Sequence, residues 1–539
     1  GVLFTYGLAA RMFGPRVGLW SALILMTSFR WWFQARTGTT DMLIAGTLAG
    51  CIYSLWRWDE SRRARWLLAT YFFLTAALYA KGPPALVFLL LAIVFFYRGE
   101  PRSRKGTRWV VGSLIALFLV ALWYIPARLL DQDPGSPVAA GGIGENLFRN
   151  TIGRVFLGTS KAQPPWYYLE TLPADLMPWT LFLPWAIAKA WRERRSDRAM
   201  RYLMAWTMPA LIFFSISVGK RATYILPLFP IFAILLARGV LAFMDEGEAN
   251  ARWRKRILGV WCGGLVVLGV GTLIAPWLTV QDMRIPAELR PRVWLFGVLL
   301  LLFATYAVLR HRYARRSPLH RVIAGQMALI WLAAVGTLFP VVNVFQSARQ
   351  FCAPLRYLAE QGEEYRLYSL GFTREAYIYY AKHPHAPVLT EMLGAGGLSL
   401  RELERAAKAQ KAAKNLIQDA VDGVPIGNID EVKPEEVAKL RAAIESAVAG
   451  AGDEAAPARA VEEQLRAVLD GFAASVGDKA PAFFFVQDDD WRWMLPLQTT
   501  PPRYYVVRQQ RVGSREVLLI ANEAGKKLLE RRVNGAALS

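Results

Sequence analysis

Long apolar runs recur from residue 1 to about residue 341, and they constrain the fold of this 539-residue chain more than any other feature. A helix needs about 20 mostly apolar residues to cross a bilayer. Hydrophobic residues make up 54% of the chain, and its mean hydropathy is +0.24, values that soluble domains rarely reach. The runs lie near 1–10, 17–33, 41–56, 67–80, 85–97, 109–126, 174–190, 202–218, 222–240, 258–279, 292–309 and 322–341. They predict an α-helical polytopic membrane protein with about twelve transmembrane helices.

The distribution of basic residues predicts how these helices are oriented. The net charge is +22, but the Lys and Arg residues cluster in short loops between apolar runs, so we predict contact with membrane lipid and no nucleic-acid partner. The basic loops are 11–16, 57–66, 98–108, 191–201, 245–257 and 310–321. They alternate with the other loops, which predicts a multi-pass protein of the bacterial inner membrane with the basic loops in the cytoplasm. The opposite loops, and everything after about residue 342, are then periplasmic.

The start of the chain raises an expectation about its length. Residue 1 lies inside an apolar run and is not Met. By the orientation above, this first run crosses toward the cytoplasm. If the native N-terminus is cytoplasmic, an odd number of helices precedes residue 1. We therefore expect an N-terminal truncation with one helix and its outer loop missing.

Two domains are predicted from the change in composition near residue 345. Residues 1–344 form the transmembrane domain, and residues 345–539 form a periplasmic α/β domain. Its expected strands are YRLYSLGF, AFFFV, YYVVR and REVLLI, which are rich in β-branched and aromatic residues. The Ala, Lys and Glu-rich part at about 400–475 is predicted to be a helical insertion.

Several common site types are disfavoured by the sequence. Cys51, Cys262 and Cys352 show no paired spacing, which argues against a disulfide scaffold and a thiolate metal site. P-loop, HExxH and GxSxG contexts do not occur, which argues against ATP-driven transport and common hydrolases. His383 and His385 fit a surface loop better than a metal site. The sequence leaves open whether a divalent metal takes part.

The charges most informative about function are those that lie outside the basic loops, on the predicted periplasmic side. Lys220 and Arg221 sit between two apolar runs with almost no loop around them, and a charge beside hydrocarbon is usually paired or functional. Other such charges on the same predicted face are Arg36, Asp41, Lys81, Glu145, Arg149, Arg154 and Lys161. Lys81 lies in the break Lys-Gly-Pro-Pro between two short runs, where Pro stops a helix. Cations at helix ends can clamp a phosphate and stabilise a phosphate leaving group.

Each of these residues also has a purely structural interpretation. The cations can reach headgroups without any further role. Arg36 and Asp41 can form a structural ion pair, and a carboxylate at position 41 also suits the start of a helix. Residues 145–154 can form a helix lying on the interface. Trp166, Tyr167 and Tyr168 fit an interfacial aromatic belt, and Tyr224 can be interfacial as well.

Taken in order, these segments resemble the bacterial aminoarabinose transferases that modify lipid A, and more widely the protein O-mannosyltransferases of the GT-C superfamily. The matching segments are Ala35-Arg36-Thr37 with Asp41, Leu78 with Lys81-Gly82-Pro83, Glu145 to Arg154 followed by Pro165-Trp166-Tyr167-Tyr168, Pro178-Trp179 before Leu183-Pro184, and Lys220-Arg221 with Tyr224-Ile225-Leu226-Pro227. The resemblance covers about 1–345. The insertion at 400–475 is atypical.

The resemblance implies a membrane glycosyltransferase whose donor is a polyprenyl-phosphate sugar. It implies an inverting transfer at the periplasmic face, from a carrier such as undecaprenyl phosphate, with neither ATP nor a nucleotide sugar. The acceptor is lipid A or another glycolipid; a protein Ser or Thr is the alternative. Two alternatives come from other classes of protein. One is a flippase for lipid-linked sugars, a function that predicts inverted repeats and charges at mid-membrane. The other is a non-catalytic scaffold.

The resemblance also assigns roles to residues. Asp41 matches a supporting catalytic carboxylate, and the principal Asp is expected upstream of residue 1. The positions near the carrier phosphate are Lys81, Arg154, Lys220, Arg221 and Tyr224. A wider set of candidates comprises Arg36, Glu145, Arg149 and Tyr167.

Overall fold

The computed structural model describes residues 1–82, 84–97, 109–130, 163–245, 250–278, 285–313, 319–369, 375–382, 480–487, 504–512 and 515–532. The chain divides into two compact units, Gly1–Val341 and Val342–Ser539, which are described separately. The expected insertion at 400–475 and His383 and His385 lie outside the described residues.

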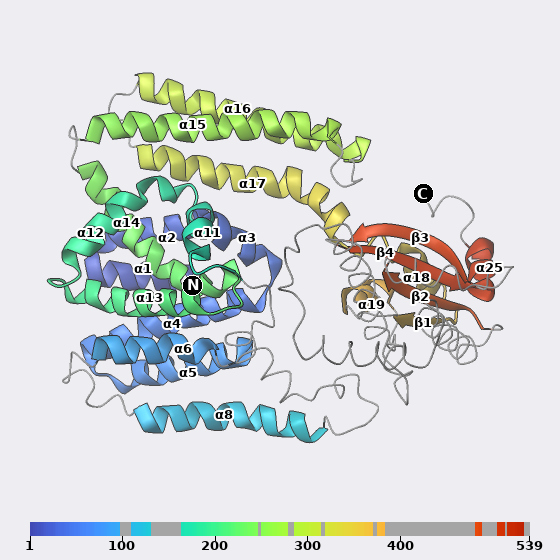
Figure 1. Ribbon diagram of the computed structural model, residues 1–539, viewed down its shortest axis with the longest axis horizontal. Helices are drawn as coiled ribbons and strands as arrows, with labels where there is room; N and C mark the ends of the chain where they lie inside the picture. The colour runs from blue at the N-terminus through green and yellow to red at the C-terminus, as the bar shows by residue number, and fades with distance from the viewer. Residues whose placement is uncertain are drawn as a thin grey trace, which may run out of the picture. The chain divides into compact units, whose positions relative to one another are not determined.

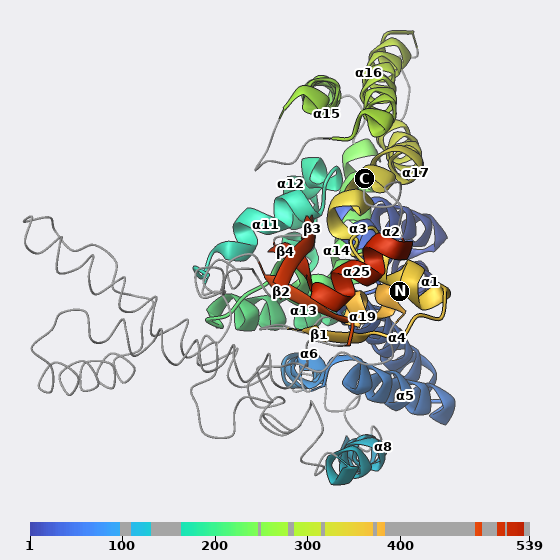
Figure 2. The same ribbon diagram turned by 90° about the vertical axis from the view of Figure 1, so that its right-hand side faces the viewer.

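Helices that run along a common direction make up the first unit, as Figure 1 shows from the side and Figure 2 shows nearly end-on. Their bounds are α1 Val2–Phe13, α2 Pro15–Thr27, α3 Phe29–Thr37, α4 Thr40–Ser61, α5 Ala64–Lys81, α6 Pro84–Ala92, α8 Trp109–Leu130, α11 Tyr167–Asp175, α12 Leu183–Glu193, α13 Arg198–Ile216, α14 Phe229–Asp245, α15 Ala251–Ile274, α16 Arg290–Tyr313 and α17 Leu319–Gln346. Every predicted apolar run therefore falls on helical structure.

Length and composition allow five of the described helical segments to cross a membrane. They are Arg198–Ile216, Ala222–Asp245, Ala251–Trp277, Ala287–Arg312 and Leu319–Gln346. The segment that contains α14 is 83% buried, whereas the one that contains α17 is 22% buried. The helix α14 thus lies at the centre of the unit, while α17 leaves most of its apolar surface for lipid.

Two of the predicted runs are not continuous helices, which corrects the sequence-based bounds. The run 17–33 is broken at Ser28, which has extended backbone angles between α2 and α3. The run 174–190 is divided into α11, a 3-10 turn at Trp179–Phe182 and α12. Pro178 precedes that turn and Pro184 lies in the first turn of α12, where proline is tolerated because its missing N–H donor would have no partner there.

Ion pairs join several of the basic loops at one end of the helices. Arg11 reaches Glu60 at 3.5 Å, Arg16 reaches Asp245 at 3.0 Å, and Arg198 bonds to Asp59. These pairs connect loops 11–16, 57–66, 191–201 and 245–257. The alternation read from the sequence therefore matches the way the helices are arranged.

A network around Arg238 holds the short helix α12 at this same end. The Arg238 guanidinium lies 2.6 Å from Glu193 and 3.2 Å from Asp197. Asp197 also accepts bonds from the backbone N–H groups of Ala199 and Met200, which caps the start of α13. One side chain of the central helix thereby fixes the ends of α12 and α13.

In its described residues, the second unit contains a four-stranded sheet with helices packed on one face. The strands are β1 Arg366–Ser369, β2 Ala482–Gln487, β3 Tyr504–Val512 and β4 Arg515–Asn522, in the order β1-β2-β4-β3. The β1–β2 pair is parallel and the other two are antiparallel. The helices are α18 Ala353–Glu360, α19 Glu375–Ala381 and α25 Glu523–Arg532. All four strands fall where the sequence predicts them.

The side chains of β2 point alternately to the two faces of the sheet, and this explains how the unit is packed. Phe483 and Phe485 belong to a buried cluster that includes residues of all three helices. Tyr365 lies 5.4 Å from Phe483 and Tyr377 lies 5.3 Å from Phe485 between ring centroids. Phe484 points to the opposite face, where it stacks on Tyr368. Successive side chains of a strand point to opposite faces of the sheet, so the apolar run of β2 contributes to the packing on both faces.

The contact between α12 and α14 generates a stability prediction. A Cβ atom at Gly239 would lie 2.5 Å from the backbone of Ala186, so the two helices pack this closely only with glycine there. We expect Gly239→Ala to cost about 1–3 kcal/mol through overpacking. The measurement is the thermal denaturation midpoint of the detergent-purified protein.

Gly259 provides the matched control for this substitution. It also lies within a helix, but a Cβ atom there would meet nothing within 4 Å. Gly259→Ala should leave the midpoint at or above that of the parent. Equal losses from the two substitutions would contradict the packing argument.

Candidate functional site

An ion pair between α4 and α5 forms the centre of the candidate site. Asp41 lies in the first turn of α4, where the helix dipole favours a carboxylate. Lys81 is the last residue of α5, and its ammonium donates a hydrogen bond to Asp41 Oδ1. Both side chains are mostly buried, with 23% of Lys81 and 17% of Asp41 exposed. Pairing of this kind lowers the cost of holding a charge beside an apolar core.

The break after Lys81 places that ammonium where it can meet its partner. Gly82 has φ 75°, in the region that favours glycine, and its N–H still bonds to the carbonyl of Leu78. The next helix, α6, begins at Pro84. The predicted helix break is confirmed, and it ends α5 at the residue that carries the charge.

Tyr224 joins the pair from a third segment of the chain. It lies in the 3-10 helix Ala222–Leu228 that precedes α14. The Lys81 ammonium is 4.9 Å from the centroid of its ring, within the range of a cation–π interaction. Three residues that the sequence analysis singled out separately are thus brought together.

Lys220 and Arg221 differ sharply in their surroundings. Lys220 is 4% exposed, and its ammonium donates a 2.7 Å hydrogen bond to the carbonyl of Gln163. Burial lowers the pKa of this ammonium. Arg221 is exposed, and its carbonyl accepts a 3.2 Å bond from the Tyr168 hydroxyl. Lys220 therefore ties two segments together, while the Arg221 guanidinium faces outward.

The aromatic run that begins α11 does not behave as one interfacial belt. Trp166 is 56% exposed, as a belt residue would be, but Tyr168 is only 2% exposed. The rings of Tyr167 and Tyr168 lie 5.3 Å apart. The belt interpretation is thus wrong for Tyr168, which anchors the backbone at Arg221. Tyr168 is not among the predicted site residues, because a Tyr in an aromatic run gives no signal of which ring is buried.

Arg36 does not form the alternative ion pair with Asp41, since Asp41 pairs with Lys81 instead. Arg36 lies in the last turn of α3, with its guanidinium 4.3 Å from the ring centroid of Phe339 and 5.6 Å from that of Trp32. It is exposed and lies on an aromatic surface that α3 and α17 share. The side chain of Arg36 is thus separate from the pair at the centre of the site.

Four of the predicted residues lie outside the described part of the chain: Glu145, Arg149, Arg154 and Lys161. Their roles stay predictions. Within the described ranges, no group of three or more His, Cys, Asp or Glu side chains is arranged to hold a metal ion. The candidate residues that the structure describes are Asp41, Lys81, Tyr224, Lys220 and Arg221, and Tyr168 bonds to the backbone of Arg221.

The chemistry open to this arrangement is recognition of an anion beside an apolar surface. Lys81 and Arg221 carry positive charge where the helices end, and a guanidinium can bind two oxygens of one phosphate. Asp41 supplies a carboxylate within the same group, able to accept a proton or orient a donor. The residues thus place two cations and a carboxylate at one end of the helices.

Comparison with known proteins shows that this architecture is shared by a class of membrane proteins. The family model described as dolichyl-phosphate-mannose-protein mannosyltransferase matches residues 1–125. The crystal structure of ArnT from Cupriavidus metallidurans bound to undecaprenyl phosphate superimposes with a TM-score of 0.63 at 18% identity, covering 97% of this chain and 82% of that one. The fold is therefore that of the polytopic GT-C membrane proteins, and the predicted fold class is confirmed.

Curated relatives point to one branch of this class. The chain is 27% identical over 341 residues to an undecaprenyl phosphate-alpha-4-amino-4-deoxy-L-arabinose arabinosyl transferase of Erwinia tasmaniensis, covering 62% of this chain and 55% of the relative. It is 40% identical over 196 residues to the protein of that name from Aeromonas hydrophila, covering 35% and 34%. The chain thus spans about half the length of the first relative. These likenesses confirm the resemblance to the aminoarabinose transferase family.

A double-mutant cycle tests whether Asp41 and Lys81 act as a unit. Removing one partner leaves the other charge unpaired in a mostly buried place, so Asp41→Asn and Lys81→Met should each lower the thermal midpoint. The double variant should lose much less than the sum, with a coupling of about 0.5–3 kcal/mol. The measurement is thermal denaturation of the full chain in detergent. Additive losses would show that the two residues act independently.

Proposed function

We propose that this protein is an integral membrane glycosyltransferase that moves a sugar from a polyprenyl-phosphate carrier to an acceptor at the periplasmic face. The observation that carries the proposal is the convergence of Asp41, Lys81 and Tyr224 from three segments into one group. The carrier is undecaprenyl phosphate, because the relatives' names specify it and the similar crystal structure contains it. The sugar is aminoarabinose and the acceptor is lipid A, as the family resemblance implies.

The phosphate of the carrier meets Lys81 and Arg221 in this proposal. Asp41 holds the Lys81 ammonium against the face of Tyr224, so the cation is in place before the carrier arrives. The Arg221 guanidinium is exposed and its backbone is fixed by Tyr168, so it can contact the phosphate without first leaving a buried site. Arg154 joins this group on the resemblance alone.

Lys220 acts behind this surface. Its buried ammonium is engaged by the Gln163 carbonyl, and this bond connects the segment before α11 to the one that carries Arg221. We therefore assign Lys220 a positioning role toward the carrier phosphate. This division of roles explains why two adjacent cations are present with so little loop around them.

The reaction step follows from these positions. A nucleophilic oxygen of the acceptor attacks the anomeric carbon from the face opposite the phosphate, and the bond from that carbon to the carrier phosphate breaks. The carrier leaves as its phosphate, and the negative charge that it gains is stabilised by the cations. A hydroxyl acceptor gives up its proton to a carboxylate, whereas an acceptor that is already a phosphate needs little help. Asp41, which accepts a hydrogen bond from Lys81, is the carboxylate that we assign to this step.

Transfer by the full-length protein in liposomes tests the proposal. Undecaprenyl-phosphate aminoarabinose is the donor and lipid A is the acceptor, with sugar on lipid A as the readout. We expect Arg221→Ala and Lys81→Met each to lower kcat/KM by about 10²-fold or more, because each removes a cation that stabilises the leaving phosphate. Asp41→Asn should lower it at least as strongly, since it also releases Lys81. Arg310→Gln, a cation at the other end of the helices, is the matched control.

The other outcomes separate the rival functions. Transfer to a Ser or Thr peptide in place of lipid A would assign the protein to the mannosyltransferase branch. Carrier lipid that crosses the bilayer without any sugar transfer would favour a flippase. Full activity of both Arg221→Ala and Lys81→Met would refute the phosphate site.

A further inference from the structure

The short helix α11 is bonded at its two ends to two parts of the first unit that are far apart in the sequence. We call residues 27–30, at the break between α2 and α3, the Ser28 joint. Residues 218–221, which precede the 3-10 helix that carries Tyr224, are called the Arg221 segment. The helix contacts both α3 and that 3-10 helix. It has nine residues, so its ends lie about 12 Å apart.

An ion pair holds the C-terminal end of α11 at the Ser28 joint. The Arg30 guanidinium donates through Nε to Asp175 Oδ1 at 2.8 Å, and its Nη2 lies 2.7 Å from the same oxygen. The Asp175 side chain is 3% exposed, and that of Arg30 is 23% exposed. Two nitrogens of one planar group therefore meet one carboxylate in a mostly buried place, which fixes the orientation of both side chains.

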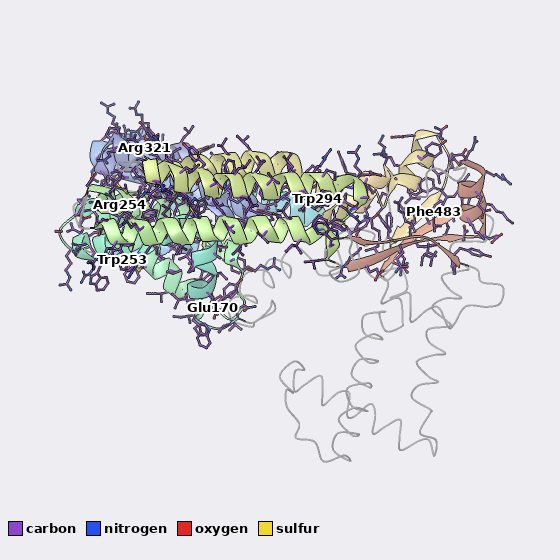
Figure 3. The ribbon with its side chains drawn as sticks, turned by 90° about the horizontal axis from the view of Figure 1, so that it is seen from above. Glu170, Trp253, Arg254, Trp294, Arg321 and Phe483 are labelled. Atoms are coloured by element: carbon purple, nitrogen blue, oxygen red, sulfur yellow. The ribbon has the colours of Figure 1, made fainter. Side chains whose placement is uncertain are left out.

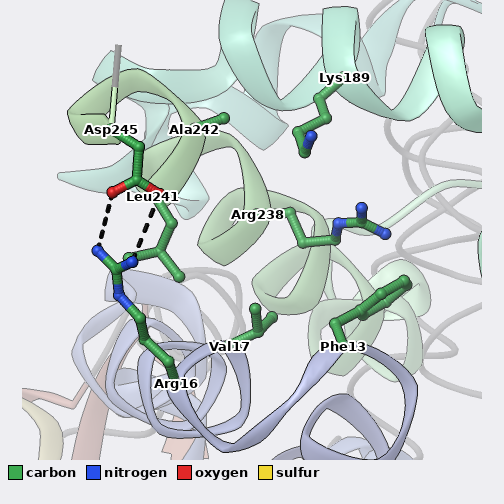
Figure 4. A pocket seen from close by; sticks show the side chains of 8 residues that line it. All are labelled: Phe13, Arg16, Val17, Lys189, Arg238, Leu241, Ala242 and Asp245. Carbon is green, nitrogen blue, oxygen red and sulfur yellow. Dashed lines mark hydrogen bonds and ion pairs between the residues drawn. The ribbon is translucent and has the colours of Figure 1, made fainter. Parts of the chain in front are cut away.

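The burial of this pair distinguishes it from an exposed pair of the same kind. Arg16 donates to both oxygens of Asp245, at 3.0 and 3.4 Å, but each side chain is more than half exposed (Figure 4). Exposed ion pairs are screened by water and constrain their partners weakly. Breaking a buried pair leaves an uncompensated charge, so the pair of Arg30 and Asp175 can hold α11 in one position.

Two further bonds join the same end of α11 to the Ser28 joint. The backbone N–H of Phe29 donates to the carbonyl of Met177 at 3.1 Å, and the Trp179 indole donates to the Thr27 hydroxyl at 2.8 Å. The break at Ser28 makes the first bond possible, because the first N–H groups of a helix have no partner within that helix. The break that interrupts the predicted apolar run thus provides an anchor for α11.

The other end of α11 is bonded to the Arg221 segment. The backbone N–H of Gln163 donates to the Val218 carbonyl at 3.3 Å, and the Lys220 ammonium donates to the Gln163 carbonyl at 2.7 Å. The Tyr168 hydroxyl donates to the Arg221 carbonyl at 3.2 Å. Since the last of these bonds is made to the backbone of Arg221, a shift of α11 moves the point from which the Arg221 guanidinium extends.

The buried face of α11 connects its two ends. Tyr168 and Asp175 occupy positions i and i+7, about two helical turns apart, so they lie on the same side of the helix. Each residue is 2% exposed. Leu169 and Glu170, on the other side, are exposed, and Figure 3 shows Glu170 at the edge of the first unit. The two polar contacts thus lie on the side of α11 that packs against the other helices.

We propose that Arg30 and Asp175 are positioning residues for the Arg221 guanidinium. Their ion pair fixes one end of α11, and Tyr168 near the other end transmits that position to the Arg221 backbone. The inference rests on the proposed function, because the pair acts on sugar transfer only if Arg221 contacts the carrier phosphate. The loss that follows from disturbing the pair should therefore depend on whether the Arg221 side chain is present.

A kinetic double-mutant cycle with the full-length protein in liposomes tests the proposal. Undecaprenyl-phosphate aminoarabinose is the donor and lipid A is the acceptor. Arg30→Lys keeps the charge but lacks the planar group that meets Asp175 through two nitrogens. We expect it to lower kcat/KM about tenfold in the parent, since small misplacements of a binding group are costly. In the Arg221→Ala background the same change should lower kcat/KM less than about twofold.

Tyr168→Phe tests the other end of α11 with a change that removes only a hydroxyl group. It should lower kcat/KM about fivefold, the equivalent of one neutral hydrogen bond, and again only when the Arg221 side chain is present. This variant decides the question if Arg30→Lys does not fold.

Arg198→Lys is the matched control for Arg30→Lys. Arg198 bonds to Asp59, which is also buried, and it lies at the start of α13, whereas Arg221 follows the end of that helix. The control should change kcat/KM less than about twofold, even where it lowers the thermal midpoint as much as Arg30→Lys does.

Hydrogen exchange gives a readout that does not depend on activity. The amides of residues 218–228 should exchange faster in Arg30→Lys than in the parent, because one end of α11 is loosened. Arg198→Lys should leave their exchange unchanged. A merely structural role for the Arg30 pair would not select these amides, which lie far from residue 30 in the sequence.

Each of three results would overturn the inference. Equal losses from Arg30→Lys in the parent and in Arg221→Ala would show that the pair supports the fold only. A loss of kcat/KM from Arg198→Lys as large as that from Arg30→Lys would lead to the same conclusion. Unchanged exchange at residues 218–228 would remove the connection through α11. Full activity of Arg221→Ala is a separate outcome, because it refutes the phosphate role of Arg221 itself and with it the role of the pair in transfer.

Discussion

The pairing of charges at the two ends of an apolar helical frame is the constraint on which the structure of the first unit depends. A lone charge beside hydrocarbon is costly, so each charge needs a partner or water. At one end, Asp41 and Lys81 join the start of α4 to the end of α5. At the other end, Arg238 joins α14 to Glu193 and Asp197. These pairs fix which helix ends meet, which the non-directional hydrophobic effect does less well.

The two ends use positive charge in different ways. Around Tyr224 the cations are few, and each is placed by a specific contact: Lys81 by a carboxylate, Lys220 by a carbonyl and Arg221 through its own backbone. At the other end, Arg238, Arg16 and Arg198 are each held by carboxylates. The first arrangement suits one phosphate in a chosen orientation, as a reaction requires. The second arrangement holds the ends of several helices together.

Part of the candidate site could be predicted from the sequence. Charges that break the positive-inside pattern are rare, so Asp41, Lys81, Lys220 and Arg221 stood out without any coordinates. The partner of Asp41 could not be predicted, because Arg36 lies nearer to Asp41 in sequence than Lys81 does. A helix end brings residues 40 positions apart into contact and turns Arg36 toward Phe339. The burial of Lys220 and Tyr168 was equally hidden, since neighbouring residues of the same type differ only in which way they face.

The sequence by itself determined the helical membrane class, the positions of the apolar runs, the four described strands of the second unit and the segments proposed to form the site. These follow from local patterns, because apolar length and the period of two report directly on burial. The tertiary structure decided the breaks at Ser28 and at residues 176–182 and the partners of the described charges. Those depend on which helices become neighbours, and a sequence of alternating apolar runs is compatible with many neighbour arrangements.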